Sequence, residues 1–344
     1  MTIRYYQFLF LGFFIVLILG FSVEVVAQQR PQYTQYIINN YIINPAITGI
    51  ENYVDIRIGR RNQWVSLSDA PVTTYISAHT PIGGGYLRGN VNSSAGSGEN
   101  PFSRSYLQSY RAAEPHHGVG VIAVFDKVGP FNRTDVAATY AYHLGITPKI
   151  NMSVGIAPGV TLLNLDLGKV STSDPNDPAI GNNANSKIMP DMSAGIWIYG
   201  AQFFIGASGQ QLIPQKLSFT TNTNYSQGQL VPHWFATAGY KFSFWENIAF
   251  QPSVMIKEIS GTPLSIDANL KTSFSDRMWL GVSYRKNDSF SILAGINPTY
   301  FLNISYSYDM TSSALSVVSQ GTHEIVLGIL LNNRYQASCP KKMW

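Results

Sequence analysis

The segment 264–331 begins LSIDANLK (residues 264–271) and ends HEIVLGILL (residues 323–331), and apolar residues take every second position along most of it. This period of two places successive side chains on opposite faces of a β-strand. The segment contains five such runs, each of about ten residues, joined by short turns. Runs of this kind predict an all-β transmembrane barrel, although a soluble β-sandwich shows the same period.

The composition favours the barrel over the sandwich. Charged residues make up 12% of the 344 residues, compared with about 25% in soluble domains, and 13% are aromatic. A water-exposed surface so poor in charge promotes association, whereas aromatic side chains suit the two interfaces of a membrane. After residue 27 there is no apolar run of the roughly 18 residues that a spanning helix needs. Only helices and closed barrels satisfy backbone groups in hydrocarbon, so the sequence predicts a barrel in contact with the lipid bilayer.

The first 27 residues have the pattern of a secretory signal peptide. Arg4 precedes an apolar core at 8–21, and Val25-Val26-Ala27 provides a small-residue cleavage site. A retained membrane anchor is the alternative, but the core is short and Glu24 follows it closely. We therefore expect a signal peptide at 1–27 and export to the outer membrane.

The rest of the chain divides into a short leading segment, the barrel and a tail. Residues 28–50 lack the period of two and predict a short helix or coil that plugs the lumen, with a position on the rim as the alternative. The barrel is expected at 51–331 and the C-terminal tail at 332–344. Residues 83–117 are rich in Gly, Ser and Asn and predict a flexible insertion, with His116 and His117 in an exposed loop.

Fourteen strands are expected in the barrel. They are 54–64, 71–80, 118–126, 133–144, 150–165, 190–199, 202–208, 232–243, 248–258, 264–271, 278–284, 290–296, 300–309 and 325–331. An even number is typical of bacterial outer-membrane barrels, which have short periplasmic turns and longer external loops. The longest ordinary loops, 166–188 and 209–231, follow the fifth and seventh strands, which predicts that both are external. The 83–117 insertion then falls on the periplasmic end.

Several charged residues are expected to face the lumen. Asp55, Arg57 and Arg61 share one face of the first strand, and Asp267 and Lys271 share one face of the tenth. A basic residue on the lipid face costs about 2–4 kcal/mol at the midplane, so an inward orientation is expected. There these residues could line a channel, but the interpretation favoured is that they tie the plug to the wall by charge-assisted hydrogen bonds.

The sequence offers little for enzymatic chemistry. It has no Gly-x-Ser-x-Gly, His-Glu-x-x-His or Gly-Lys-Ser/Thr motif. His323 and Glu324 are neighbours on a strand, so they point to opposite faces and cannot act together as a general base. We expect no catalytic residue, no cofactor and no metal site, and the net charge of +4 is too small to indicate nucleic acid.

A series of short motifs runs through nearly the whole chain after the signal peptide. They are Tyr33-Thr34-Gln35-Tyr36, Asn44-Pro45-Ala46, Arg61-Asn62-Gln63-Trp64, Asp126-Lys127-Val128-Gly129, Pro190-Asp191, Trp279-Leu280-Gly281, Tyr284-Arg285, Tyr306-Ser307-Tyr308-Asp309 and Gly321-Thr322-His323-Glu324-Ile325. Each is weak alone, but in this order they resemble the PorP/SprF family of type IX secretion proteins in Bacteroidetes outer membranes. The insertion 83–117 is longer than expected in that family.

The resemblance implies a fatty-acid-porin-like barrel of fourteen strands. It also implies a role in exporting or retaining surface proteins, often large adhesins used in gliding motility, that the type IX translocon delivers. Some relatives look like the outer-membrane anchor of the periplasmic motor ring. The partners implied are other type IX secretion components and a periplasmic motor-ring or peptidoglycan-associated lipoprotein.

Two functions from different classes remain. The first is an interaction protein whose external loops, 166–188 and 209–231, hold a secreted adhesin or its C-terminal domain at the cell surface. The second is a passive or fatty-acid-porin-like channel for small or hydrophobic solutes. Fold alone does not decide between them.

Overall fold

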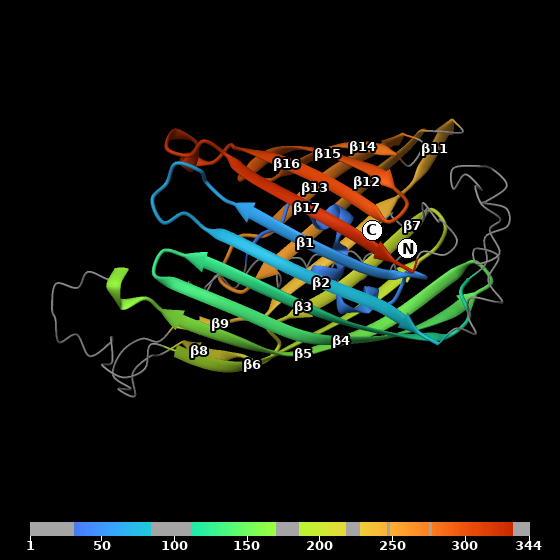
Figure 1. Cartoon of the computed structure of the whole chain (residues 1–344), viewed down its shortest axis with the longest axis horizontal. Coiled ribbons are helices and arrows are strands. Elements are labelled where there is room, and N and C mark those ends of the chain that lie inside the picture. The colour runs from blue at the N-terminus through green and yellow to red at the C-terminus, as the bar shows by residue number, and fades with distance from the viewer. Residues whose placement is uncertain are drawn as a thin grey trace, which may run out of the picture.

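The alternating segments form antiparallel strands that close into a single barrel (Figure 1). The structure is a computed structural model that describes residues 31–83, 112–169, 186–217, 228–245, 248–274 and 277–332. The predicted signal peptide at 1–27, most of the predicted insertion, and all but the first residue of the predicted tail lie outside these residues.

The barrel strands of the described chain match the predicted set closely. They are β1 (Val54–Asn62), β2 (Val72–Ile82), β3 (His116–Val128), β4 (Phe131–Thr147), β5 (Ile150–Leu165), β6 (Ser186–Tyr199), β7 (Phe203–Gln210), β10 (His233–Tyr240), β11 (Phe242–Trp245), β12 (Ile248–Ile259), β13 (Ser265–Phe274), β14 (Met278–Arg285), β15 (Ser289–Thr299), β16 (Leu302–Thr311) and β17 (Thr322–Leu331). A small hairpin, β8 (Gln215–Leu217) with β9 (Gly228–Leu230), stands apart from them.

Closure of the sheet depends on two pairings. β1 pairs with β17, and β10, the neighbour of β7, pairs with β12 on its other side. β10 and β11 are separated only by Lys241 and both pair with β12, so they form one strand of the barrel. Counted in this way, the described residues form a closed barrel of fourteen antiparallel strands, as predicted.

The predicted start of the third strand is wrong by two residues. His116 and His117 begin β3 instead of lying in an exposed loop, and they pair with His143 and Tyr142 of β4. His116 is buried and His117 is exposed, as alternation along a strand requires. The polar, Gly-rich stretch before them gives no local sign of a strand. β3 extends to His116 because it pairs there with β4, which lies further along the chain. The predicted insertion at 83–117 therefore ends before His116.

Alternation along each strand separates an apolar outer face from a more polar inner face. On β14 the outward residues are Met278, Leu280, Val282 and Tyr284, all at least 41% exposed. The intervening side chains on the same strand are buried inside the barrel, and they include Ser283 and Arg285. Among the described residues there is no helix with the length and apolarity needed to cross a bilayer.

A plug, defined here as residues 31–50, lies inside the barrel (Figure 1). It contains three short 3-10 helices, η1 (Gln35–Ile38), η2 (Asn40–Ile42) and η3 (Pro45–Ile47), and every residue from 34 to 50 is buried. The prediction of a plug is therefore confirmed, and the alternative position on the rim is wrong. Two further 3-10 turns, η4 (Leu167–Lys169) and η5 (Ala314–Val317), lie in loops.

The two ends of the barrel differ. The loop end, at the left of Figure 1, carries the connections 166–185 after β5 and 211–232 after β7. The turn end, where β1 begins and β17 finishes, has tight connections at 148–149, 200–202 and 300–301. Neighbouring strands are antiparallel throughout, so successive connections alternate between the two ends. The connections that follow the first, third, fifth and every further odd-numbered barrel strand therefore fall at the loop end, with β10 and β11 counted as one strand.

A charge placed on the outer face tests which part of the wall meets lipid. Val282→Arg, in the middle of β14, is expected to lower the free energy of unfolding by about 2–4 kcal/mol in lipid vesicles. The control Met278→Arg lies on the same face at the end of the same strand, where the cost is about 0–1 kcal/mol. Denaturant unfolding of the reconstituted barrel measures both, and equal losses for the two variants would contradict a lipid-facing band.

Candidate functional site

The plug runs along the lumen from the loop end to the turn end. At its beginning, the Gln32 side-chain oxygen accepts a hydrogen bond from Arg285, the last residue of β14. At its end, the Gly49 backbone meets His79 near the end of β2 and His116 at the start of β3. Since β14 ends at the loop end and β3 starts at the turn end, the two tied points lie at opposite ends of the barrel.

An anchor cluster holds the first turn of the plug. The Glu324 carboxylate accepts hydrogen bonds from the Thr34 backbone N–H (2.9 Å), from Arg61 (3.0 Å) and from the Tyr75 hydroxyl (3.0 Å). Arg61 also pairs with Asp309 at 2.8 Å, and the Thr34 hydroxyl donates to the same Asp309 oxygen at 2.7 Å. The anchor cluster consists of these five residues, and all of them are at least 98% buried.

Burial explains why these groups must stay together. A charge removed from water is tolerated only when it is paired and hydrogen-bonded. Arg61 comes from β1, Asp309 from β16 and Glu324 from β17, and the plug contributes Thr34 at their centre. The electrostatics of three wall strands therefore fix the position of the plug.

Gln35 extends the same contact along the wall. Its side-chain amide donates to the Glu324 backbone oxygen at 2.7 Å, and its side-chain oxygen accepts from the Ser305 hydroxyl. Gln35 is fully buried, so this pairing satisfies polar atoms that would otherwise be costly inside the lumen.

A second ionic contact lies at the loop end. Arg285 binds the Asp267 carboxylate through Nε and Nη2 at 3.0–3.1 Å. Its Nη1 reaches Asp288 and the Gln32 side chain, each at 3.1 Å. A bidentate guanidinium–carboxylate pair is the stronger kind of ionic contact, and here it also holds the start of the plug.

Asn44 ties the middle of the plug to the backbone of the wall. Its side-chain amide donates to the carbonyls of Ile196 and Ala207, a register pair of β6 and β7, at 3.1 and 3.2 Å. Its side-chain oxygen accepts from the Ala46 N–H at 2.9 Å and so caps η3. The 3-10 turn begins here because Asn caps it and Pro45, which has no N–H to satisfy, fills the first position.

Inward-facing glycines make room for the plug backbone. A Cβ atom added at Gly155 would clash with the Pro45 carbonyl, and one added at Gly195 would clash with the Asn44 side chain. Glycine inside a strand weakens the sheet, and it often marks a close approach by another backbone. Here that backbone belongs to the plug.

A histidine clamp, consisting of His79, His116 and His143, closes on the end of the plug. His79 Nδ1 accepts from the Gly49 N–H at 3.1 Å, and His143 Nε2 donates to the Thr48 carbonyl at 2.8 Å. The rings of His116 and His143 stack with centroids 4.6 Å apart. Among the described residues no three His, Cys, Asp or Glu side chains are arranged to hold a metal ion.

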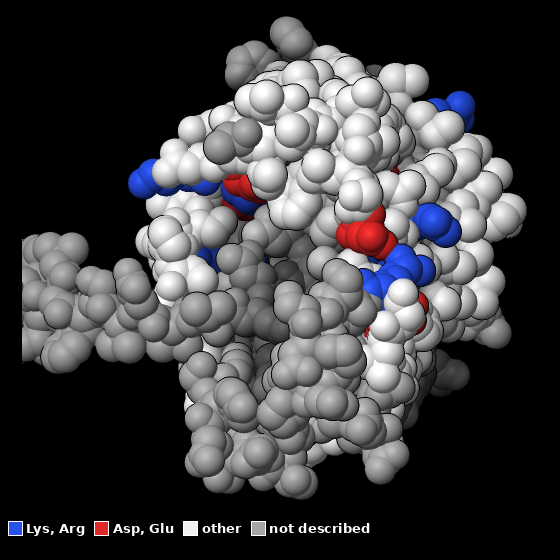
Figure 2. Space-filling model, turned by 90° about the vertical axis from the view of Figure 1, so that its left-hand side faces the viewer, with Lys and Arg blue, Asp and Glu red and all other residues white. Residues whose placement is uncertain are grey.

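The lumen opens at the loop end into a mouth cavity of about 490 Å³. Acidic and basic side chains lie next to each other on its rim (Figure 2). Its walls include Gln32 of the plug, Trp64, Lys257, Arg285 and Asp288. The start of the plug thus forms part of the wall of the mouth cavity.

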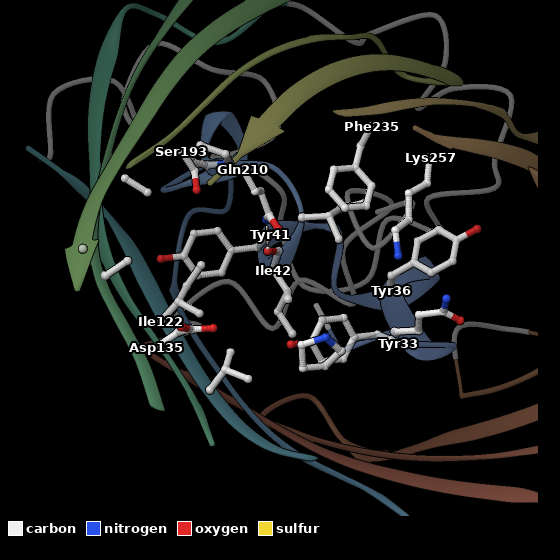
Figure 3. Close-up of a pocket in the computed structure, with 18 of the residues that line it drawn as sticks. Tyr33, Tyr36, Tyr41, Ile42, Ile122, Asp135, Ser193, Gln210, Phe235 and Lys257 are labelled. Carbon is white, nitrogen blue, oxygen red and sulfur yellow. Dashed lines mark hydrogen bonds between the residues drawn. The ribbon is translucent and has the colours of Figure 1, made fainter. Parts of the chain in front are cut away.

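A smaller inner cavity of about 60 Å³ continues beside the plug. It shares Gln32, Lys257 and Arg285 with the mouth cavity and is otherwise largely apolar. Tyr36, Ile42 and Phe235 lie around this space in Figure 3.

The inner cavity also reaches the wall between β4 and β5. It touches Ala137 and Gly159 there, beside a point where two register pairs, Ala138 with Pro158 and Thr139 with Ala157, are missing. Proline has no N–H to donate, which accounts for the gap in the ladder.

One exposed ion pair links two connections of the loop end. The Lys169 ammonium in η4 bonds to Asp69, which lies between β1 and β2. This hydrogen bond lowers the pKa of the Asp69 carboxyl below its usual value and raises the pKa of Lys169 above its own. Both groups are exposed to solvent, so the pair adds little to stability.

The charged residues singled out in the sequence all lie inside the barrel. Arg61 bonds directly to the plug, and Asp267 reaches it through Arg285. Asp55 and Arg57 instead pair with each other along β1 at 2.9 Å. The Lys271 ammonium lies 5.3 Å from the ring centre of Trp279.

Five of the motif positions meet at the plug. They are Asn44, Arg61, Arg285, Asp309 and Glu324, and they are joined there by Pro45 at the start of η3. The motifs are far apart in the sequence, yet in the structure they all lie along the contact between the plug and the inner face of the barrel.

The other motif positions lie elsewhere. Gln63 and Trp64 begin the β1–β2 connection, where their N–H groups donate to the Pro71 carbonyl and the Thr322 hydroxyl. Asp191 borders the inner cavity, whereas Pro190 faces outward on β6. Tyr284 and His323 are also on the outer face, and His323 lies beside Tyr306.

Sequence reasoning missed the histidine clamp, Tyr75 and the role of the inward glycines. A usable signal was present for the glycines, since Gly118, Gly155 and Gly195 each interrupt a strand at an inward position. The histidines gave no such signal, because nothing in their spacing along the sequence shows that all three meet the same part of the plug.

Arg61→Met tests the anchor cluster. It leaves two buried carboxylates without their cation, so the free energy of unfolding is expected to fall by about 3–5 kcal/mol. Arg60→Met is the control, because Arg60 is adjacent but exposed on the outer face. Denaturant unfolding measures both variants, and similar losses in the two would contradict the assigned role of Arg61.

Gly155→Ala tests the close contact between the plug backbone and the barrel wall. The added methyl group overlaps the Pro45 carbonyl, so we expect a loss of about 1–3 kcal/mol and readier proteolysis of the plug. Gly281→Ala is the control, because its Cβ would meet its nearest neighbour at 3.5 Å, an ordinary contact. Ion conductance in planar bilayers should rise only in Gly155→Ala. If the plug of that variant resists proteolysis as well as the native plug does, the close contact at Gly155 is contradicted.

Comparison with known proteins identifies the family of this chain. The sequence model described as type IX secretion system membrane protein PorP/SprF matches residues 25–329. No curated protein matches the chain.

Solved barrels resemble it at low identity. The toluene transporter TbuX of Ralstonia pickettii shares 10% identity over 84% of this chain and 92% of that chain, with a TM-score of 0.48. The toluene transporter TodX of Pseudomonas putida shares 9% over 90% and 98%, with a TM-score of 0.43. The outer membrane protein Omp33 of Acinetobacter baumannii shares 8% over 83% and 99%, with a TM-score of 0.44.

The family match covers most of the chain, including the plug, the anchor cluster and all the strands up to Ile329 of β17. This chain belongs to the PorP/SprF family of type IX secretion system membrane proteins.

Proposed function

We propose that this chain holds a secreted, adhesin-like surface protein at the outer membrane as part of type IX secretion, and that the loop end of the barrel binds it. The partner is the secreted protein or its C-terminal domain, and binding supports its export or its anchoring at the surface. The proposal includes export of the chain itself by the predicted signal peptide.

The plug is the observation that carries this proposal. The lumen is occupied by a segment fixed at both ends by buried polar contacts, so solute passage from one end of the lumen to the other requires those contacts to break. In contrast, the mouth cavity at the loop end has both acidic and basic groups on its rim. These features support binding at an end of the barrel over conduction through it.

The distribution of connections supports the choice of end. Outer-membrane barrels place short turns in the periplasm and longer loops outside the cell. The loops 166–188 and 209–231 both belong to the loop end, and their central parts lie outside the described residues. The turn end then faces the periplasm, where other type IX components, a motor ring or a peptidoglycan-associated lipoprotein would dock.

We also propose a role without catalysis. The buried carboxylates and arginines of the anchor cluster are engaged with one another and with the plug. Groups held in this way serve to position a segment, and they leave little freedom to act on a substrate.

A second candidate is passage of small or hydrophobic solutes. The observation that favours it is the largely apolar inner cavity, which shares lining residues with the mouth cavity beside the plug. In this case the plug would have to move aside during transport.

Replacing loop segments tests the first candidate. Residues 170–185 and 218–227 are each replaced by a short Gly-Ser linker, and the control replaces 84–111 at the turn end. We expect both loop-end variants to lose the secreted protein that co-purifies with the native barrel, and the control to keep it. Immunofluorescence of intact cells measures surface retention in parallel.

The two candidates predict different failures. Normal retention of the secreted protein in both loop-end variants contradicts binding at this end. If solute uptake falls instead while retention is unchanged, the channel function is supported.

A further inference from the structure

A histidine and two tyrosines form a cluster on the outer wall at the turn end. His117, the second residue of β3, is exposed, and its Nδ1 lies 2.6 Å from the Tyr140 hydroxyl. Its ring centre is 5.0 Å from that of Tyr142. Tyr140 and Tyr142 alternate on β4 and are both exposed on the outer face. These three residues are named the turn-end cluster.

The same arrangement recurs at the loop end. His323, the second residue of β17, has its Nδ1 2.6 Å from the Tyr306 hydroxyl and its ring centre 5.0 Å from that of Tyr308. Tyr306 and Tyr308 alternate on β16, as the tyrosines of the first cluster do on β4. His323, Tyr306 and Tyr308 are named the loop-end cluster.

The two clusters lie at opposite rims of the outer wall. β3 starts at the turn end and β17 starts at the loop end. Beyond His117 the outward side chains are Val119 and Val121, and beyond His323 the first is Ile325, all of them apolar and exposed. Barrels of this type carry an outward apolar band about 25 Å tall with aromatic residues at its two borders. The clusters therefore stand where the band meets the headgroup layers.

The hydrogen bond in each cluster determines what the imidazole can offer. In the tautomer in which the tyrosine O–H donates to Nδ1, the neutral ring carries its hydrogen on Nε2. The imidazole rings of His117 and His323 make no other hydrogen bond within the described part of the chain. Each Nε2–H in that tautomer is a donor at a membrane border, where lipid headgroups offer acceptors.

We propose that each cluster binds the phosphate of a lipid headgroup, with the histidine Nε2–H as the donor. Phosphate oxygens are strong acceptors, and a charged acceptor gives a stronger hydrogen bond than a neutral one. The phosphate comes from either a phospholipid or a lipid A group, and the two rims meet different leaflets. The sites fix the depth and orientation of the barrel in the bilayer.

A tyrosine without a histidine provides the comparison. Tyr284 is 50% exposed on the outer face near the end of β14, and its side-chain hydroxyl takes part in none of the hydrogen bonds of the described residues. Tyr284 serves as an ordinary aromatic residue at the border of the apolar band. Tyr284→Phe therefore removes a hydroxyl at this border and leaves both clusters unchanged.

Lipid binding to the purified full-length barrel tests the proposal. His117→Phe, His323→Phe and the double variant keep an aromatic ring and remove the donor. Native mass spectrometry measures binding of phosphatidylglycerol, of lipid A and of a phosphate-free diacylglycerol glycoside. We expect each single variant to lose one phosphate-lipid site, with affinity reduced about tenfold, the size of one hydrogen bond. Binding of the glycoside is expected to stay unchanged, as is all binding to Tyr284→Phe.

The two phosphate lipids distinguish the sources. Loss of lipid A binding in His323→Phe alone assigns the loop-end cluster to lipid A, whereas loss of phosphatidylglycerol alone assigns it to a phospholipid. Unchanged binding of both lipids in the double variant overturns the proposal. So does an equal loss in Tyr284→Phe, or an equal loss of the glycoside.

A second pair of variants covers a failure to fold. Tyr140→Phe and Tyr306→Phe retain the ring and remove the hydroxyl that fixes the imidazole. Weaker phosphate-lipid binding in both supports the sites, and native binding in both overturns them. Retention of the compact barrel on a non-denaturing gel shows which variants are folded.

Discussion

The packing of this barrel depends on one buried guanidinium, that of Arg61. It lies between the carboxylates of Asp309 and Glu324, and Thr34 of the plug completes the contact. None of these charges would be tolerated alone away from water. Thr34 donates hydrogen bonds to both carboxylates, so the wall charges also hold the plug. This constraint follows from size, since a barrel of about eight strands can fill its interior with its own side chains, and a wider one cannot.

The remaining contacts adapt the wall to that segment. Where the plug backbone passes closest, the wall has glycine, as at Gly155 and Gly195. Where plug carbonyls and N–H groups would be unsatisfied, the wall offers histidines near Thr48 and Gly49. Buried backbone groups need such partners because short 3-10 turns leave many of their own unpaired. The plug and the inner face thus form one packed unit along the lumen.

The sequence was sufficient to predict most of the wall but not the contacts inside it. The strand at 150–165 was predicted with the bounds that the structure has, because alternation is a local signal. The bond between Thr34 and Glu324 joins residues 290 positions apart, and no local pattern carries that information. Alternation showed that Arg61 faces inward, yet it did not show what Arg61 would meet there. His116 was misplaced for a related reason, because its pairing with His143 depends on the neighbouring strand.

The surfaces of the barrel that are left for a protein partner are its two ends. The outer face is committed to lipid by its apolar side chains, and the inner face is committed to the plug. Of the two ends, the loop end combines the mouth cavity with the first residues of the plug, which Arg285 holds at its edge. A partner bound there meets wall, loops and plug together, and it rests on a scaffold that the anchor cluster keeps rigid. Binding at the loop end and closure of the lumen are therefore compatible, because the contacts that fill the barrel also steady the surface that a partner would use.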